Sequence, residues 1–487
     1  MPWMLKADQS VRKKARSLVM RPLVAIVCCV VPAQAQYGMG NSNSINYGNS
    51  QSSTGNLLGS VPTGKLSDEV LQLTLRDAVD RALKYNLGSI EGGENARLAR
   101  GQRLVALSKL LPEVSVGATV YEEQLNLTRY GAALPGLPRV IGPYSAGSAD
   151  VSVSQTLFSF ESIQRFRAAR NAEQAAQLSY QDVLDAVTLT VGNAYLQVVA
   201  EDSRIQAQQA QVRNAKALND QARDEVEAGT APRIDATRTE VQLHTEEYNL
   251  SIARNNFAVA KLNLSRAIGL PAGQQFEIAE KLPYTESIPL TLNDALSMAS
   301  KSRNDLRAAL EQEKAAEKTH SAAEGERLPT VAYSGGYSDS GTTFDNSHGG
   351  FTFQAGVRIP IFTGGRIKGE TTQTEAALRQ RKAEAENLRG QIDYDVRTAF
   401  LNLNAAKEQV AVAQQNVALA NESLARSKDR FTSGVTDSVE VVQAEQALAS
   451  ANEQFITSLY NHNFSKLSLA RALGVARTNY QQYLGAR

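Results

Sequence analysis

The sequence is poor in the residues that cross-link exported proteins or bind metals. Its 487 residues include two cysteines, four histidines, five methionines and one tryptophan. Because Cys28 and Cys29 both lie in the first 35 residues, the rest of the chain has no disulfide, thiolate metal site or cysteine nucleophile. Aromatic residues make up only 6%. This composition favours long packed helices over a dense aromatic core.

No pattern in the sequence predicts catalysis. The histidines are scattered, at His244, His320, His348 and His462, without the spacing of metal ligands. We therefore expect no catalytic residue, no metal and no cofactor. The net charge is +1 for the whole chain and −4 without its first 35 residues, which gives no indication of nucleic acid as a partner.

No stretch after the N-terminal segment approaches the length of a transmembrane helix. Near the N-terminus, a basic region is followed by an apolar run over 23–31 and by Ala33-Gln34-Ala35, which predicts a secretory signal peptide over 1–35. Residues 36–66 include a stretch rich in Gly, Ser and Asn and are predicted to be a flexible linker. If this exported chain enters a membrane, it must do so with β-strands.

The rest of the sequence is a duplication. "LTLRDAVDRAL" from Leu73 returns as "LTLNDALSMAS" from Leu290, 217 residues later. "LNLSRAIGL" from Leu262 returns as "LSLARALGV" from Leu467, 205 residues later. Two stable offsets indicate repeated units that differ in the length of one loop. We predict a first repeat over 67–270 and a second over 271–487.

Each repeat is expected to begin with an amphipathic helix of about 35 residues that ends before a proline, Pro112 or Pro329. Two strands with period-two alternation follow in each repeat. They are predicted over about 113–121, 149–158, 330–337 and 350–361. Strands of about 10 residues have the length that crosses a bilayer when tilted.

Very long helices follow the strands, over about 162–228 and 366–433, and neither contains proline. Each would span about 100 Å at ~1.5 Å per residue. Apolar residues seven apart, such as Val417 and Leu424, are typical of a coiled coil. Turns are expected near residue 229 and near residue 434, each followed by a returning helix of about 35 residues.

Four amphipathic strands cannot cross a membrane alone, because open sheet edges are not tolerated in lipid. Natural barrels have at least about eight strands. Three copies would supply twelve. The sequence therefore predicts a mainly α fold that is internally duplicated and has a small membrane β-barrel portion. The trimeric 12-stranded barrel would be continued by a long α-helical coiled-coil tunnel.

The ordered set of motifs resembles the TolC-type outer membrane efflux proteins. The doubled Leu-Pro-strand motif, "PIFTGGR" from Pro360, the paired turn glycines and the paired Ala-x-Gly helix ends carry the resemblance over nearly all of 73–475. It implies a homotrimer in the outer membrane lipid of a Gram-negative bacterium, extending into the periplasm. It also implies a periplasmic adaptor, an inner-membrane pump, and a duct for a tripartite efflux pump or a type I secretion system.

The resemblance also assigns roles to the two turns. An acidic residue six positions after the second turn glycine, here Glu440, would constrict the pore, with Gln443 three positions further on. Asp235 has the same spacing in the first repeat. The alternative is that both acids only favour helix N-termini. The tips that contact the adaptor would be Ala228, Gly229, Thr230, Ser433, Gly434 and Val435, although both glycines would also serve as ordinary C-caps.

Alternation along the last strand assigns its two faces. Phe351, Phe353, Val357 and Ile359 are expected to face lipid, and Thr352, Gln354 and Arg358 to line the lumen. Two other classes compete with the duct. A passive porin would need a complete barrel in one chain, and a soluble periplasmic coiled-coil interaction protein would need no amphipathic strands.

Overall fold

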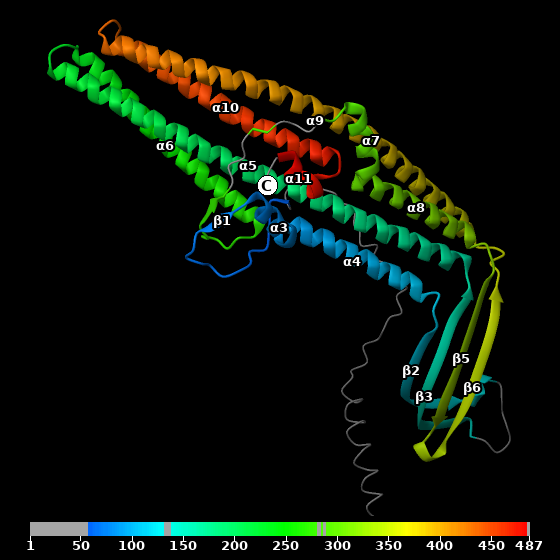
Figure 1. Cartoon of the computed structure of the whole chain (residues 1–487). Coiled ribbons are helices and arrows are strands. Elements are labelled where there is room, and N and C mark those ends of the chain that lie inside the picture. Colours follow the sequence, from blue (N-terminus) through cyan, green and yellow to red (C-terminus); the bar gives the residue numbers. More distant parts are fainter. Residues whose placement is uncertain (1–56, 131–137, 280–283, 286–288, 485–487) are drawn as a thin grey trace, which may run out of the picture. The chain divides into compact units, whose positions relative to one another are not determined.

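The computed structural model describes residues 57–130, 138–279, 284–285 and 289–484. All of them belong to one compact unit, Ser53–Arg487. The predicted signal peptide and the linker up to residue 56 lie outside the described residues. Figure 1 shows a group of long helices with a small β-sheet at one end.

The two repeats contain the same elements in the same order. The first contains α3 (Leu75–Tyr85), α4 (Leu87–Ser108), β2 (Glu113–Asn126), β3 (Val140–Phe158), α5 (Phe160–Glu227) and α6 (Arg233–Ile268). The second contains α7 (Leu292–Ser302), α8 (Asn304–Gly325), β5 (Thr330–Gly341), β6 (Ser347–Arg358), α9 (Arg366–Thr432) and α10 (Ser438–Ala472). A short helix, α11 (Ala476–Leu484), follows the second repeat, and β1 (Leu71–Leu73) pairs in parallel with β4 (Phe276–Ile278).

The helix expected before each strand pair is broken in two, which corrects the sequence prediction. Asn86 separates α3 from α4, and Arg303 separates α7 from α8. Both residues have extended backbone angles, with φ −67° and ψ 138° at Asn86 and φ −61° and ψ 114° at Arg303. The side chains of the two break residues bond to other parts of the fold, so tertiary contacts override a helical periodicity that the sequence sustains.

Part of the predicted linker makes hydrogen bonds with the rest of the fold. The backbone N–H of Val61 donates to Tyr85 O, and that of Thr63 donates to Gly269 O. Arg81 Nη2 donates to Thr63 O at 2.7 Å and to Gly269 O at 2.8 Å. Val61 and Thr63 are therefore held near the break between α3 and α4 by backbone hydrogen bonds and by the Arg81 side chain.

The long helices of the two repeats pack side by side. α5 packs on α6 and on α10, and α10 packs on α9, so α5 and α10 lie between α6 and α9. A segment of α5 is apolar and long enough for a membrane span by composition, but 56% of that window is buried inside the molecule. Val187, Val191 and Tyr195 of α5 are fully buried in the core of the first repeat. α5 is therefore the central core helix.

The sheet of four strands has the order β2-β3-β5-β6, and all its pairs are antiparallel. The strands have 14, 19, 12 and 12 residues. The first three are longer than expected, most of all β3, whereas β6 has the expected length but begins and ends three residues earlier. β6 ends at Arg358. Ile359, predicted as part of a lipid-facing strand, therefore lies just beyond the strand, directly before Pro360, which cannot donate a ladder hydrogen bond.

Candidate functional site

The sheet separates apolar from polar side chains across all four strands. One row joins Val116, Val151, Tyr337 and Phe351 as direct cross-strand neighbours, and the next joins Val114, Val153, Gly335 and Phe353. On the opposite face, the corresponding row joins Ser115, Ser152, Gly336 and Thr352. In these rows, the alternation seen in single strands continues across the sheet, because the register keeps residues of one kind in line.

The apolar face is open to the surroundings. The exposed fractions are 85% for Phe351, 69% for Phe353 and 64% for Val357. Thr352, Gln354 and Arg358 alternate with them on the other face of β6. A continuous exposed face of large apolar side chains is an unusual feature of a soluble surface and marks contact with lipid or protein.

The outer strands of this sheet, β2 and β6, each pair on one side only within the described residues. An unpaired edge presents N–H and C=O groups that need partners when water is excluded. One copy of the chain therefore has two edges that complementary strands must cover before the apolar face can be placed in a bilayer.

The two helix turns opposite the sheet share one backbone design. Gly229 has φ +75° and Gly434 has φ +68°. In the first turn, Thr230 N donates to Glu225 O and Gly229 N donates to Val226 O; in the second, Val435 N donates to Arg430 O and Gly434 N to Phe431 O. These paired bonds satisfy the last carbonyls of α5 and α9, and the positive φ favours glycine.

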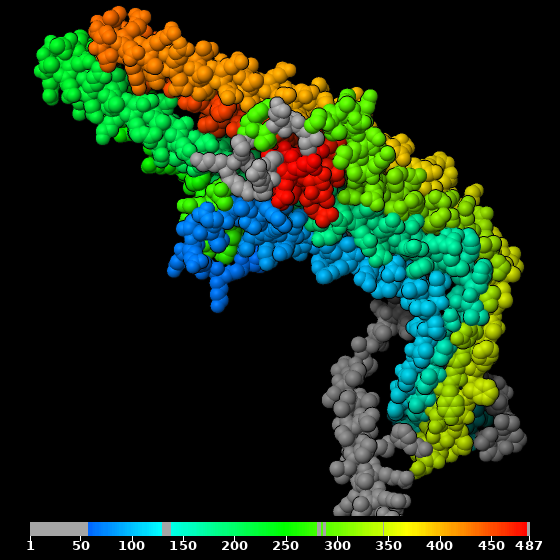
Figure 2. Space-filling view, viewed as in Figure 1, coloured from blue at the N-terminus to red at the C-terminus, as the bar shows by residue number. Residues whose placement is uncertain are grey.

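The turns lie next to each other, as Figures 1 and 2 show at the ends of the green and orange helices. Ser438 Oγ, fully buried at the start of α10, donates to Asp235 Oδ1 on α6 at 2.9 Å. The Asp235 side chain is only 12% exposed, and Arg238 lies 3.6 Å from its carboxylate. Asp235 therefore joins the two turns of one chain.

The other two predicted constriction residues lie on α10 one turn apart. Glu440 accepts from Thr436 Oγ1 at 2.6 Å and lies 3.6 Å from Arg430 of α9, with its side chain 36% exposed. Gln443 is exposed. It borders a groove of about 300 Å³ between α6 and α10, lined by Thr237, Arg238, Val241, Ser438, Val439, Val442 and Gln443. Asp235 therefore lies on α6 and contacts the start of α10, whereas Glu440 and Gln443 lie on α10 itself.

Further along the helices from the turns, two buried acids, Glu445 and Glu246, lie inside the helix group. Glu445 is 2% exposed, and burial raises its pKa while Lys428, 3.5 Å away on α9, opposes the shift. Glu246 is 7% exposed and accepts from Gln208 of α5 and from Gln242. The sequence analysis did not single out either residue, because an isolated Glu on a helix has the pattern of a solvated face.

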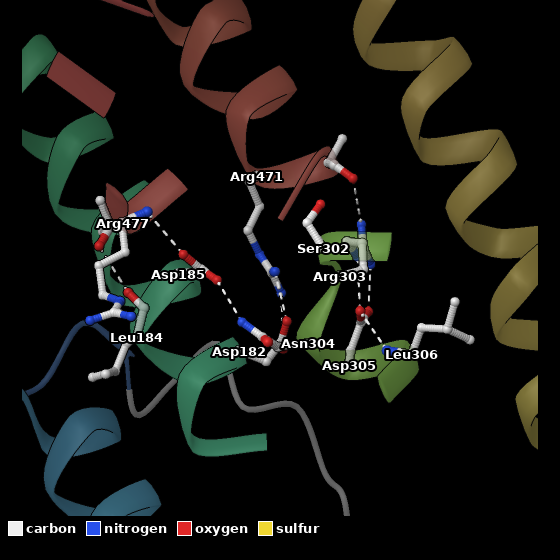
Figure 3. Close-up of polar contacts among 12 residues, drawn as sticks. Asp182, Leu184, Asp185, Ser302, Arg303, Asn304, Asp305, Leu306, Arg471 and Arg477 are labelled. Atoms are coloured by element: carbon white, nitrogen blue, oxygen red, sulfur yellow. Dashed lines mark hydrogen bonds and ion pairs between the residues drawn. The ribbon is translucent and has the colours of Figure 1, made fainter. Parts of the chain in front are cut away.

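A polar network near the helix breaks connects the repeats (Figure 3). Arg471 of α10 makes a bidentate pair with Asp182 of α5, at 2.7 and 3.0 Å. The next turn of α5 places Asp185 under the start of α11, where its Oδ1 accepts from Arg477 N at 2.9 Å. Burial raises the pKa of Asp185, and the bond from Arg477 opposes that shift.

The two break residues occupy equivalent places. Asn86 Nδ2 donates to Ala267 O at 3.1 Å, and Arg303 Nη1 donates to Ala472 O at 3.4 Å. Both pairs keep the repeat offsets of 217 and 205 residues. The two offsets could have identified these pairs from the sequence, but asparagine and arginine share no pattern that marks them as equivalents.

The C-cap glycines lie against the same breaks. Gly269 and Gly474 both have φ +72°. A Cβ at Gly269 would lie 2.9 Å from Tyr85 Cβ, and one at Gly474 would lie 2.9 Å from the Arg303 backbone. The two helix ends are therefore similar in sequence because each must be left-handed and in close contact with a helix break.

Comparison with known proteins identifies the class that these features define. The family model described as "Outer membrane efflux protein" matches residues 95–270 and 295–475, once in each repeat. The chain is 26% identical to "Outer membrane protein TolC" of Escherichia coli (strain K12) over 349 residues, 68% of this chain and 70% of that protein. It is 22% identical to "Outer membrane efflux protein BepC" of Brucella suis over 86% of this chain and 88% of that one.

A solved structure has the same fold. The Campylobacter jejuni CmeC outer membrane channel superposes with a TM-score of 0.72 at 16% identity, covering 87% of this chain and 92% of that one. The chain belongs to the outer membrane efflux protein family. It is an outer membrane channel protein of efflux systems, as the resemblance in its sequence implied.

Proposed function

We propose that three copies of this chain close into one duct that crosses the outer membrane and extends through the periplasm. The observation that carries this proposal is the four-stranded sheet with an exposed apolar face and two unpaired edges. Three such sheets, joined β6 to β2, give twelve strands without a free edge. Phe351, Phe353 and Val357 would then face lipid, and Thr352, Gln354 and Arg358 would line the water-filled lumen.

The outer helices of one chain support the same assembly. α6 exposes Val241, Tyr248, Ile252 and Val259 at heptad spacing, and α9 exposes Tyr394, Leu401, Val412 and Leu419. Tyr248 lies 19 residues after Gly229, and Val412 lies 22 residues before Gly434. At ~1.5 Å per residue these positions are at similar distances from the turns, so α6 of one copy can pack on α9 of the next.

Paired cysteines test this contact directly, because both native cysteines precede the predicted cleavage site. A chain with Tyr248→Cys and Val412→Cys should form a ladder of disulfide-linked dimers and trimers on oxidation in the membrane. The two single variants are the matched controls, and neither should form disulfide-linked dimers or trimers. If the double variant stays monomeric under oxidation while the protein remains active in export, the proposed contact is wrong.

In this duct, the tip residues Ala228, Gly229, Thr230, Ser433, Gly434 and Val435 would contact a periplasmic adaptor, which links the duct to an inner-membrane pump. Deletion of the gene should increase sensitivity to a panel of toxic compounds, or abolish secretion of a protein if the partner is a type I secretion system. A deletion strain that shows neither defect would contradict the proposal.

Glu440 and Gln443 would lie at the constriction, whereas Asp235 would hold the two turns of each copy together through Ser438. Three Glu440 carboxylates around one axis attract cations and repel anions. Glu440→Gln should therefore reduce the cation preference of the channel in a planar bilayer. The control Glu422→Gln removes an acid paired with Arg426 on the exposed side of α9 and should leave selectivity unchanged. If both variants change the cation preference equally, Glu440 does not lie at the constriction.

A further inference from the structure

His462 of α10 is buried without a polar partner. Its exposed fraction is 0%, and neither ring nitrogen has a hydrogen-bond partner. One face of the ring stacks on Tyr284, with the ring centroids 4.9 Å apart. An imidazole in such a place is stable only in its neutral form, because a charged ring would lose its hydration without gaining a partner.

The next turn of α10 fixes the residue that follows Tyr284. Lys466, 1% exposed, donates from Nζ to Thr285 Oγ1 at 2.7 Å and also to Thr285 O. Thr285 Oγ1 in turn donates to Leu484 O of α11 at 3.3 Å. Tyr284 and Thr285, which lie between the two repeats in the sequence, are thus held on α10 by one stack and one buried ammonium group.

Only cations act on His462 from the surrounding elements. Lys466 lies one turn away on α10, and Lys407 acts from α9. Among the described residues, no acidic side chain contributes at His462 or Lys466. A proton added to the imidazole would therefore meet two positive charges and, within the part of the chain that the structure describes, no compensating carboxylate.

We propose that His462 makes the seating of Tyr284 and Thr285 on α10 sensitive to pH, so that acidification releases the two residues. The device is independent of the proposed function, because it rests on contacts within one chain. Release exposes the imidazole to water and relieves both the desolvation and the repulsion from the two lysines. A channel protein of the outer envelope is exposed to the pH of the surroundings, and a histidine changes its charge in response to that pH.

The direction of the pH effect follows from the linkage between proton binding and the stability of the seated form. Burial, with smaller contributions from Lys466 and Lys407, lowers the pKa of His462 to about 4, against an ordinary value of about 6.5. The seated form therefore binds fewer protons than the released form, so its stability falls as the pH falls below 6.5 and reaches a floor below 4. These values predict that the equilibrium constant for release rises about 20-fold between pH 7 and pH 5.

The titration of Lys466 does not account for a change between pH 7 and pH 5. Burial lowers its pKa to about 8, so the ammonium group stays mostly charged between pH 7 and pH 5. Its bonds to Thr285 therefore change little there. Among the described histidines, His462 is the one that stacks on Tyr284.

Histidine hydrogen–deuterium exchange by mass spectrometry tests the first step on the unmodified protein. The C2 proton of His462 should exchange slowly, with a titration midpoint below 6, whereas His244, whose side chain is 69% exposed, should exchange fast. Lys407→Gln should raise the midpoint of His462, because it removes one repelling charge at an exposed position. Fast exchange with an ordinary midpoint at His462 would overturn the proposal.

A tryptophan reporter tests the release itself. Trp3 is the single tryptophan of the chain and precedes the predicted cleavage site, so Tyr284→Trp places one indole in the mature protein. Its quenching by acrylamide should increase on acidification with a midpoint between 4 and 6.5. His462→Gln in that background should abolish the transition, and the control His320→Gln should not. A transition that persists unchanged without His462, or none down to pH 4 in its presence, contradicts the proposal.

Discussion

In the first repeat, the break between α3 and α4 is fixed by a neutral side chain, and in the second the break between α7 and α8 is fixed by a charged one. Asn86 donates to Leu57 O at 2.7 Å and to Ala267 O, and its own oxygen accepts from Gly88 N. Arg303 donates to Asp305 and Asp395 and to Ala472 O. Duplication preserved the geometry of this junction while its chemistry diverged.

The surroundings explain the difference. The segment from Leu57 to Thr63 covers the first junction and supplies backbone acceptors. In the second junction, Arg303 reaches carboxylates from its own helix and from α9 instead. A neutral junction tolerates changes of pH, whereas a junction built on a buried guanidinium depends on every partner.

The largest expected effect is therefore Arg303→Met. It leaves the Asp305 and Asp395 carboxylates next to an apolar group, which should cost about 3–5 kcal/mol of unfolding free energy. Asn86→Ala should cost less, about 1–3 kcal/mol, because it orphans neutral groups only. Thermal and denaturant unfolding in detergent measures both.

The matched control is Arg397→Met, which removes an exposed pair with Asp393 on α9 and should cost about 0.5 kcal/mol or less. Equal losses for Arg303→Met and Asn86→Ala would show that the charge at the second junction adds nothing to the geometry.

Alanine at the C-cap glycines should give the next largest effect, and it should be similar in the two repeats. Gly269→Ala and Gly474→Ala each force a left-handed residue, which costs about 1–2 kcal/mol, and each places a Cβ 2.9 Å from the facing helix break. Gly101→Ala in α4, where no atom lies near the added Cβ, should stabilise by up to about 1 kcal/mol. Circular dichroism melts compare the three variants, and a neutral result at Gly269 and Gly474 would contradict the close approach.

Acidification should change the stability of the two junctions differently. Burial raises the pKa of Asp305, but the hydrogen bonds and charge of Arg303 oppose it and the net shift is downward. The stability that Asp305 contributes is thus present above its ordinary value of 3.8 and lost as the pH falls through its folded value. Asp185 has a raised pKa, so its contribution changes above 3.8 and with the opposite sign.

Backbone hydrogen exchange at pH 5 and pH 3, corrected for the intrinsic rate, measures this difference. Protection at the α7–α8 break should fall at pH 3 more than protection at the α3–α4 break. A loss confined to the first junction would be inconsistent with the assignment of charge to the second.

The smallest expected effect concerns the buried acid near the turns. Because burial raises the pKa of Glu445 above its ordinary value of 4.5, its charged form destabilises the fold at neutral pH, and this cost falls as the pH decreases from the folded pKa toward the ordinary value. Glu445→Gln should therefore be neutral or stabilising by less than about 1 kcal/mol at pH 7, with no such gain at pH 4. A clear loss of stability at pH 7 would indicate that the pair with Lys428 outweighs the cost of burial.

The sequence predicted the long helices, the turn glycines and the four strands because each has a local signal: periodicity, a glycine after the last helical residue, or alternation. It failed at Asn86 and Arg303, where the helical pattern continues and only distant carbonyl groups impose the break. It also missed the first part of β3, residues 140–148, which includes Gly142 and Pro143 and resembles a loop. Spacing singled out Asp235 as a candidate, but its bond to Ser438 depends on how the two repeats meet.

The measurement that tests the central claim most directly is the mass of the mature protein, extracted from membranes in mild detergent and analysed by native mass spectrometry. The account predicts a complex of three chains that withstands detergent and separates into single chains on heating. A single chain that is stable in water without detergent, with β2 and β6 covered by its own segments, would contradict it.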